Sequence, residues 1–164
     1  LHHMHEPMVG WSVLTNLLKP GGLMKIGLYS ELARPHIAGI REKTKWLRTA
    51  ASKADIRAFR NSLAESDDKN HKLLTTSNDF FSYSNFRDLL FNVQEHHFTL
   101  PQIKKSLDQL GLKFCGFESE QIVHQFKNYY GNAADTSDLT LWHEFEQCYP
   151  RTFAGMYQFW CQKI

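Results

Sequence analysis

The hydrophobic pattern is clearest at residues 17–29, LLKPGGLMKIGLY, where an apolar helix end leads through Lys-Pro-Gly-Gly into a second apolar run. Pro20 cannot continue a helix, because it lacks a backbone N–H and its ring clashes with the preceding turn. The two glycines after it allow positive φ and therefore a tight reversal. The apolar run at residues 23–29 predicts a strand covered on both faces, as in a parallel sheet.

Helical periodicity flanks this turn on both sides. Pro7 suits the first turn of a helix over residues 7–18, and the apolar positions predicted on one side of it are Trp11, Leu14, Leu17 and Leu18. After the strand, Ser30–Glu31 has the composition of a helix start, although Pro35 could delay that start or kink the helix. The apolar positions that continue in helical spacing are Ile37, Ile40 and Leu47, followed by a second set at Ile56, Phe59 and Leu63.

The rest of the chain alternates helices and strands, which predicts the α/β class. Residues 66–78 are polar and predict a loop, followed by a helix with Ser84 as its N-cap. The amphipathic positions of that helix are Phe86, Leu89, Leu90 and Val93. Thr99–Gln102 has the spacing of a capping box, and Gly111 is expected to end the helix that it opens. The remaining predicted elements are a strand at 112–118, helices at 119–130 and 137–149, and a terminal strand at 153–162.

Composition and charge fit one globular domain of 164 residues, 42% of them hydrophobic. The net charge of +2 gives no overall polyelectrolyte basis for binding nucleic acid or a membrane surface. Residues 41–60 hold seven basic and two acidic residues, interleaved with Trp46 and Phe59. This segment could contact RNA or another anionic partner, but we favour a solvated helix face, since the charges form no single stripe.

The three cysteines, Cys115, Cys148 and Cys161, are too far apart in sequence to form a CxxC motif. They indicate neither a disulfide framework nor a thiolate zinc site, and they favour a reducing, cytoplasmic environment. No apolar run is long enough to span a bilayer, so no membrane association is expected.

A series of short motifs follows this pattern along the chain. In order they read LHHMHEP, LKPGG, IGLYSELAR, DFFSYSNFRDLLF, QEHHFTLPQIKKSLDQLGLKFCGFE and FAGMYQFW. Together they resemble the second half of the Rossmann-like methyltransferases that use S-adenosylmethionine, in particular a bacterial subgroup in which some members carry tetratricopeptide repeats upstream. The resemblance covers essentially the whole chain.

The resemblance implies the C-terminal half of a Rossmann-like methyltransferase sheet with a largely helical insertion. The implied strands are 23–29, 112–118 and 153–162, the last lying antiparallel between the other two. Residues 1–30 and 99–164 would form the sheet and its covering helices, while 31–98 would be the insertion, packed over the substrate side. Residues 1–164 are thus expected to be a single truncated domain.

The front half of such a fold is expected to be missing. Leu1 would be the last residue of a fourth strand. The glycine-rich loop and the acidic residue that hold S-adenosylmethionine in the family have no counterpart in the sequence. Cofactor binding is therefore expected of a longer parent protein, with Leu1 and His2 at the edge of its cofactor site, and this chain alone is expected to be inactive. The strand at 23–29 would have an open edge, which predicts self-association there or a rearrangement that covers it.

His2 and His3 are the candidate catalytic residues, because they sit where the fourth strand should end, at the rim where open α/β sheets bind ligands. A methyl acceptor that must lose a proton needs a base with a pKa near neutrality, and one of these imidazoles could serve. The alternative is that both are helix-capping or supporting polar groups. With His5 they could also suggest a metal site, but no matching cysteine or aspartate cluster is evident, and we expect no metal.

Candidate substrate-binding residues follow the end of the fifth strand and lie in the implied insertion. They are Tyr29, Ser30, Arg34, Arg87, Glu95 and His96. Tyr29 could stack on a substrate and Arg34 could bind an acidic group in bidentate fashion, and a buried tyrosine and a solvated arginine are the alternative. Arg87, next to Asp88, could reach the same pocket with the two residues named last, although an ion pair or a cap contact within its helix is the more ordinary account.

The leading interpretation is the acceptor-side half of an S-adenosylmethionine-dependent methyltransferase, with a methyl acceptor that the sequence leaves open. The alternative from another class is a non-catalytic helical protein-interaction module, or a degenerate methyltransferase domain that binds partners. Binding of S-adenosylmethionine by the longer parent protein would separate the two.

Overall fold

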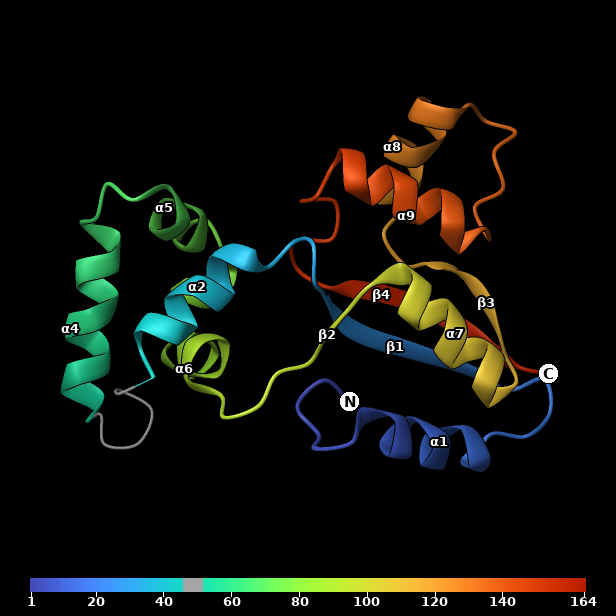
Figure 1. Cartoon of the computed structure of the whole chain (residues 1–164), viewed down its shortest axis with the longest axis horizontal. Coiled ribbons are helices and arrows are strands. Elements are labelled where there is room, and N and C mark those ends of the chain that lie inside the picture. Colours follow the sequence, from blue (N-terminus) through green and yellow to red (C-terminus); the bar gives the residue numbers. More distant parts are fainter. Residues whose placement is uncertain (46–51) are drawn as a thin grey trace. The chain divides into compact units, whose positions relative to one another are not determined.

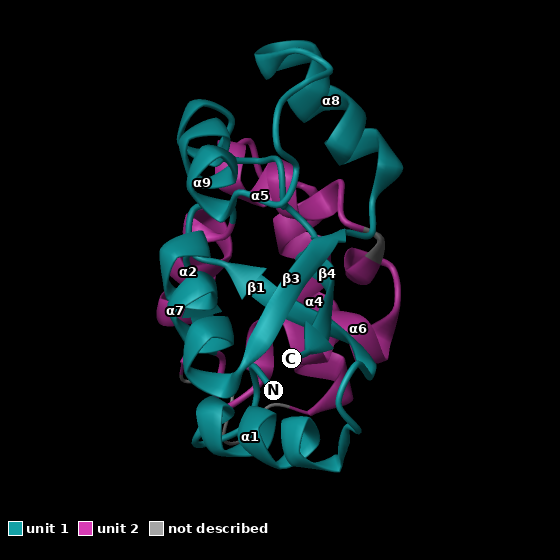
Figure 2. Ribbon diagram, turned by 90° about the vertical axis from the view of Figure 1, so that its right-hand side faces the viewer, with its two compact units in different colours: residues 1–33, 96–164 teal, residues 34–95 magenta. Residues whose placement is uncertain are grey.

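The structure, a computed structural model, describes residues 1–45 and 52–164 (Figure 1). The chain divides into two compact units, which Figure 2 shows in different colours. Unit 1 comprises residues 1–33 and 96–164, and unit 2 comprises residues 34–95. Unit 2 falls inside the segment expected to be an insertion.

Unit 1 is built on a four-stranded sheet with the strand order β2-β1-β4-β3. Its strands are β1 (Leu23–Ser30), β2 (His97–Phe98), β3 (Leu112–Phe117) and β4 (Tyr157–Lys163). β4 pairs antiparallel with both β1 and β3, with Phe159 opposite Ile26 on one side and Phe117 on the other. β1 and β3 therefore run parallel with β4 between them, and the expected position of the terminal strand is confirmed. That strand begins at Tyr157 rather than Phe153, because residues 151–155 form turns.

Four helices belong to unit 1: α1 (Pro7–Leu17), α7 (Leu100–Leu110), α8 (Glu120–Tyr130) and α9 (Leu139–Cys148). The predicted capping box at the start of α7 is confirmed, since Thr99 and Gln102 make both of its hydrogen bonds. Gly111 ends α7 at a φ of 64°, in the left-handed region that favours glycine. Gly21, in the turn between α1 and β1, has a φ of 75°, so this turn also requires glycine.

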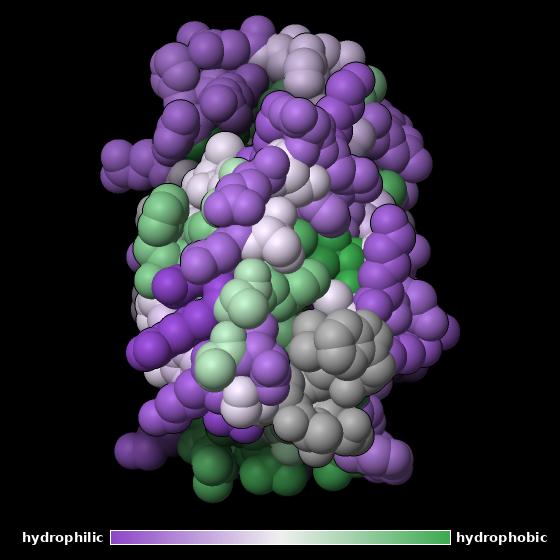
Figure 3. Space-filling view, turned by 90° about the vertical axis from the view of Figure 1, so that its left-hand side faces the viewer, coloured by the Kyte–Doolittle hydropathy of each residue, from purple (hydrophilic) through white to green (hydrophobic). Residues whose placement is uncertain are grey.

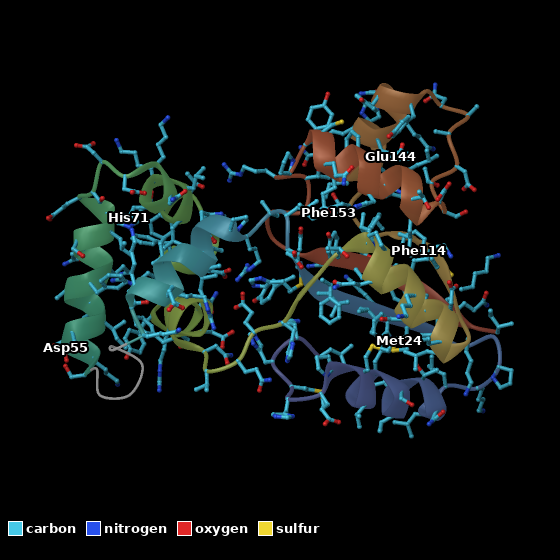
Figure 4. All side chains as sticks on the ribbon, viewed as in Figure 1. Met24, Asp55, His71, Phe114, Glu144 and Phe153 are labelled. Atoms are coloured by element: carbon cyan, nitrogen blue, oxygen red, sulfur yellow. The ribbon has the colours of Figure 1, made fainter. Side chains whose placement is uncertain are left out.

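The core of unit 1 lies on one face of the sheet. Ile26 and Leu28 of β1 are buried there with Trp11 of α1 and Phe159 of β4. Other members come from the remaining helices: Ile103, Leu107, Phe126 and Trp142. Figure 4 labels Met24, Phe114 and Phe153, which also pack in this cluster.

The opposite face of the sheet is exposed in the described residues. Lys25, Lys113 and Trp160 are exposed on it, and Glu118 forms an ion pair with Lys25 at 3.1 Å. The prediction that β1 is covered on both faces is therefore wrong. The run LMKIGLY looked continuous because glycine and tyrosine count as apolar, but burial along the strand alternates with period two.

The predicted buried side of α1 is also partly wrong. Trp11 is fully buried, but Leu14 is 43% and Leu17 is 78% exposed. Val9 and Val13 are each 55% exposed, and the helix PMVGWSVLTNL contains no charged residue. Figure 3 shows hydrophobic surface along the lower edge of the view, at the level where α1 lies in Figure 1. An uncharged helix with a broad exposed apolar side is typical of a surface that has a partner.

Unit 2 is a helical bundle with its own hydrophobic core. Its elements are α2 (Pro35–Lys43), α4 (Lys53–Ala64), α5 (Lys69–Thr75), a 3₁₀ turn at Asn78–Phe80, and α6 (Tyr83–Phe91). The buried side chains include Ile37, Ile40, Ile56, Leu63, Leu74, Phe86 and Leu90. The expected positions Ile37, Ile40, Ile56 and Leu63 are thus buried, and Phe59 is partly buried against them. Leu47, with Trp46 and Arg48, lies outside the described residues.

Three boundary predictions in this region are wrong. The helix expected from Ser30 begins at Pro35, because Ser30 still belongs to β1. Residues 66–78 contain α5, whose N-cap Asp68 accepts two backbone N–H bonds. The N-cap of α6 is Ser82 rather than Ser84, and Val93, 87% exposed, lies beyond the end of that helix. Short polar helices of this kind depend on caps and tertiary packing more than on hydrophobic periodicity.

Among the residues that the structure describes, no helix combines the length and apolar character needed to cross a membrane.

Candidate functional site

The carboxyl end of β1 gathers several of the predicted site residues. The rings of His2 and Tyr29 lie 4.3 Å apart between centroids, and those of His2 and His3 are at the same distance. The backbone N–H of His96 donates to the carbonyl oxygen of His2 at 2.8 Å, and His97 pairs with Tyr29 across the parallel strands. The expected grouping of both candidate bases with Tyr29 and His96 is therefore present in unit 1.

His2 also lies over the open edge of β1. Its Nδ1 is 3.1 Å from the carbonyl oxygen of Gly27. The residue opposite Gly27 is Gln158, whose carbonyl accepts from Glu118 of the β3 side, so the peptide groups of Gly27 face away from β4. When Nδ1 donates to this carbonyl, the lone pair of the neutral imidazole is on Nε2, which is the form that a general base needs.

Ser30, at the end of β1, contacts a carboxylate that the sequence did not bring into the site. Its hydroxyl donates to Glu146 Oε1 at 2.5 Å, and Tyr157 donates to Glu146 Oε2 at 2.6 Å. All three residues are fully buried, and the Ser30 oxygen also accepts the backbone N–H of Ala33. Burial raises the pKa of Glu146, and the two hydroxyl donors oppose that rise.

Glu146 has a structural role in this arrangement. It joins β1, α9 and β4 through Ser30 and Tyr157, and its complete burial keeps it from contacting a ligand. Burial also raises the pKa of Tyr157, so its phenol stays protonated as a donor. The sequence does contain a signal for the burial of Glu146. This residue lies four residues after Trp142 and seven after Leu139, which puts it on the same, buried side of the helix.

Arg34 and Glu95, two further candidates, meet inside unit 2. Arg34 contacts Glu95 Oε1 at 3.2 Å, and Arg41 contacts Oε2 at 3.1 Å. The three side chains are 3%, 8% and 3% exposed for Arg34, Arg41 and Glu95. Arg41 also donates to the carbonyl oxygens of Leu89 and Asn92. Arg34 is thus neither solvated nor aimed at a substrate acid, because its acidic partner is Glu95.

Arg87 does not join this group. It is exposed on α6, whereas the ion pairs of Glu95 are with Arg34 and Arg41. Asp88 accepts a hydrogen bond from Asn92 at 2.9 Å. A reach of Arg87 into a pocket with Glu95 and His96 therefore stays a prediction.

Within residues 1–45 and 52–164, no three or more His, Cys, Asp or Glu side chains are arranged to hold an ion. Cys115, Cys148 and Cys161 are all free thiols. A groove with a volume of about 880 Å³ lies between α8 and the segment that follows α9, and neither His2 nor His3 lines it.

Comparison with known proteins gives one relative and no family. No family model matches the chain. An uncharacterized protein from a Synechococcus species is 26% identical over 125 residues, which cover 71% of this chain and 30% of that protein. The chain therefore spans less than a third of the length of the relative that it matches.

Proposed function

We propose that this chain is the acceptor-side half of an S-adenosylmethionine-dependent methyltransferase domain, part of a Rossmann-like sheet. The observation that supports this most is the arrangement of β1, β4 and β3, in which the last strand runs antiparallel between two parallel ones. This is the arrangement that the resemblance implies for the fifth, seventh and sixth strands. The methyl acceptor is a small molecule or macromolecule that stays open in this proposal.

The uncovered surfaces of unit 1 fit the same proposal. A doubly wound sheet has helices on both faces, whereas here one face exposes Lys25, Lys113 and Trp160. β2 pairs with β1 only at Tyr29 and Ser30, so most of that edge of β1 has no strand beside it in the described residues. A front half of the sheet would cover the edge, the face and the apolar side of α1. Self-association through the β1 edge stays a prediction.

The residues present do not fit a complete cofactor site. The sequence has no glycine-rich loop, Leu1 packs against the core, and His2 contacts Gly27 and Tyr29. We therefore assign cofactor binding to a longer protein that contains this chain. In that protein, this chain would supply a proton-accepting imidazole, from His2 or His3, and the Tyr29 ring at the carboxyl end of β1.

Calorimetry with S-adenosylmethionine on this chain and on the longer protein tests the proposal. We expect binding by the longer protein only. In that protein, His2→Gln or His3→Gln should lower kcat by about 100-fold, the scale of general-base catalysis, and His3→Gln should leave cofactor affinity unchanged. His124→Gln on the exposed side of α8 is the matched control and should leave kcat unchanged. Unaltered kcat in both of the first two variants would remove the catalytic assignment.

A non-catalytic interaction module is the second candidate. It is favoured by the separate hydrophobic core of unit 2 and by the exposed apolar side of α1. In this case neither this chain nor the longer protein binds S-adenosylmethionine. The calorimetry described above therefore decides between the two candidates.

A further inference from the structure

A groove in unit 1 has the size of a small-molecule site. Its volume is about 880 Å³, within the range usual for ligand pockets. It is lined by residues of α8 and α9, two helices that Figure 1 labels, and by residues 149–152. The lining includes the aromatic residues Phe145, Tyr129 and Tyr149, and also Arg151.

Aromatic rings form one wall of this groove. Tyr129 and Tyr149 are about half exposed, at 49% and 50%. Their ring centroids are 5.6 Å apart in an edge-to-face arrangement. Both rings rest on Phe145, which is buried, at 5.5 Å and 5.0 Å. Because a buried ring holds both tyrosines in place, the wall offers apolar contact area at a small entropic cost.

Arg151 supplies the only charge among the residues that line the groove. It is exposed, and within the described part of the chain its guanidinium has no hydrogen-bond or ion-pair partner. Arg34 and Arg41 differ from it, because both are buried against Glu95. A planar guanidinium beside aromatic rings suits a ligand with an anionic group next to a flat ring. The pKa of Tyr129 is raised, chiefly by its hydrogen bond with Cys148. A phenol with an ordinary or raised pKa is uncharged near neutral pH, so this wall carries no negative charge to repel such a ligand.

The groove continues toward the sheet. A smaller hollow of about 260 Å³ shares Ser119, Ile122 and Thr152 with it. This hollow reaches Glu118 beyond the carboxyl end of β3 and Gln158 on β4. In open α/β sheets, ligands bind at the carboxyl ends of the strands. The groove therefore leads to the edge of the sheet where a binding site is expected.

We propose that this groove binds a small ligand in which a planar aromatic ring carries a carboxylate. The ring lies against Tyr129 and Tyr149, and the carboxylate pairs with Arg151. The site is distinct from the histidines at β1, and its existence does not depend on the methyltransferase proposal.

Titration of the ¹⁵N-labelled chain with 2-naphthoate, followed by NMR, tests this site. We expect a Kd of about 1 mM or below, as ligand efficiency allows for a molecule of this size. Shifts should be confined to α8, α9 and residues 149–152. The uncharged 2-naphthamide and the non-aromatic cyclohexanecarboxylate should each bind about tenfold more weakly, because each lacks one of the two contacts.

Variants separate the two contacts. Arg151→Gln should weaken 2-naphthoate about tenfold and leave 2-naphthamide unchanged, since only the charge-assisted pair is lost. Tyr149→Leu should weaken both aromatic probes, and its spectrum checks that the fold is retained. Arg57→Gln removes an exposed arginine from α4 and is the matched control. Unchanged affinity of Arg151→Gln for 2-naphthoate would overturn the proposal, as would shifts outside the groove or no shifts up to about 10 mM, tenfold above the expected Kd.

Discussion

The two units each bury one glutamate, and they satisfy it in opposite ways. In unit 1, Glu146 accepts from two neutral hydroxyls, those of Ser30 and Tyr157. In unit 2, Glu95 lies between two guanidiniums, those of Arg34 and Arg41. The same residue type at similar burial therefore has a raised pKa in the first case and charged partners in the second.

The difference shows what each glutamate contributes. A carboxylate among neutral donors is costly to ionise, so proton uptake relieves it. A carboxylate between arginines neutralises charges that are themselves buried, and its removal breaks both ion pairs. Glu95 thus ties α2 to the segment after α6 by ion pairs, while Glu146 ties β1, α9 and β4 by hydrogen bonds alone.

The largest expected effect comes from breaking the ion-paired cluster. Glu95→Gln should lower the free energy of unfolding by about 3–5 kcal/mol, because it removes the carboxylate that pairs with the buried guanidiniums of Arg34 and Arg41. Urea unfolding followed by circular dichroism measures it. Asp108→Asn, which breaks the exposed pair with Lys104, is the control and should cost about 0.5 kcal/mol or less. A cost for Glu95→Gln as small as that of the control would contradict the assigned role.

An intermediate effect is expected from removing one neutral donor. Tyr157→Phe keeps the buried ring but takes the hydroxyl from Glu146, which should cost about 1–3 kcal/mol. The pKa of Glu146 should rise further, since the bond from Tyr157 lowers it in the unaltered chain. Urea unfolding near neutral pH gives the stability. No loss there would mean that Glu146 is already satisfied without the phenol.

The smallest effect is expected from Glu146→Gln, and it depends on pH. The pKa of Glu146 in the folded chain is raised above its ordinary 4.5. The folded state therefore holds this proton more tightly, and its stabilising contribution is complete below pH 4.5 and is lost as pH rises through the folded pKa. Glu146→Gln lacks this loss, because its side chain does not titrate. Its free energy of unfolding should differ from that of the unaltered chain by about 1 kcal/mol or less at neutral pH.

The urea unfolding midpoints of the unaltered chain and of Glu146→Gln, measured from below pH 4.5 to neutral pH, check the last prediction. The difference between the unaltered chain and Glu146→Gln should grow in favour of the variant as pH rises. A difference that stays constant with pH would show that the carboxyl does not titrate in that window.

Local chemistry in the sequence predicted local structure well. The turn at Gly21, the capping box at Thr99 and the end of α7 at Gly111 each depend on backbone rules that operate within a few residues. The position of β4 followed from a resemblance rather than from periodicity. The proximity of His2, His3 and Tyr29 was predicted because the implied fourth and fifth strands have their carboxyl ends at the same edge of the sheet.

Long-range partners were beyond the sequence. Arg34 and Glu95 are 61 residues apart, and Ser30 and Glu146 are 116 apart, so no local pattern joins them. The exposed side of α1 was misjudged for a related reason. Periodicity identifies an apolar helix face, but what packs on Leu14 and Leu17 depends on the neighbours that the fold supplies.

The place of β4 has a consequence for how unit 1 assembles. β4 is the last strand in sequence among the described residues, yet it joins β1 to β3. Met24 and Cys161 face each other across 137 positions of chain, and closing so long a loop slows folding. Until β4 docks, β1 and the Trp11 ring of α1, which packs against Phe159 of β4, are exposed together. A half-assembled intermediate would therefore be prone to aggregation.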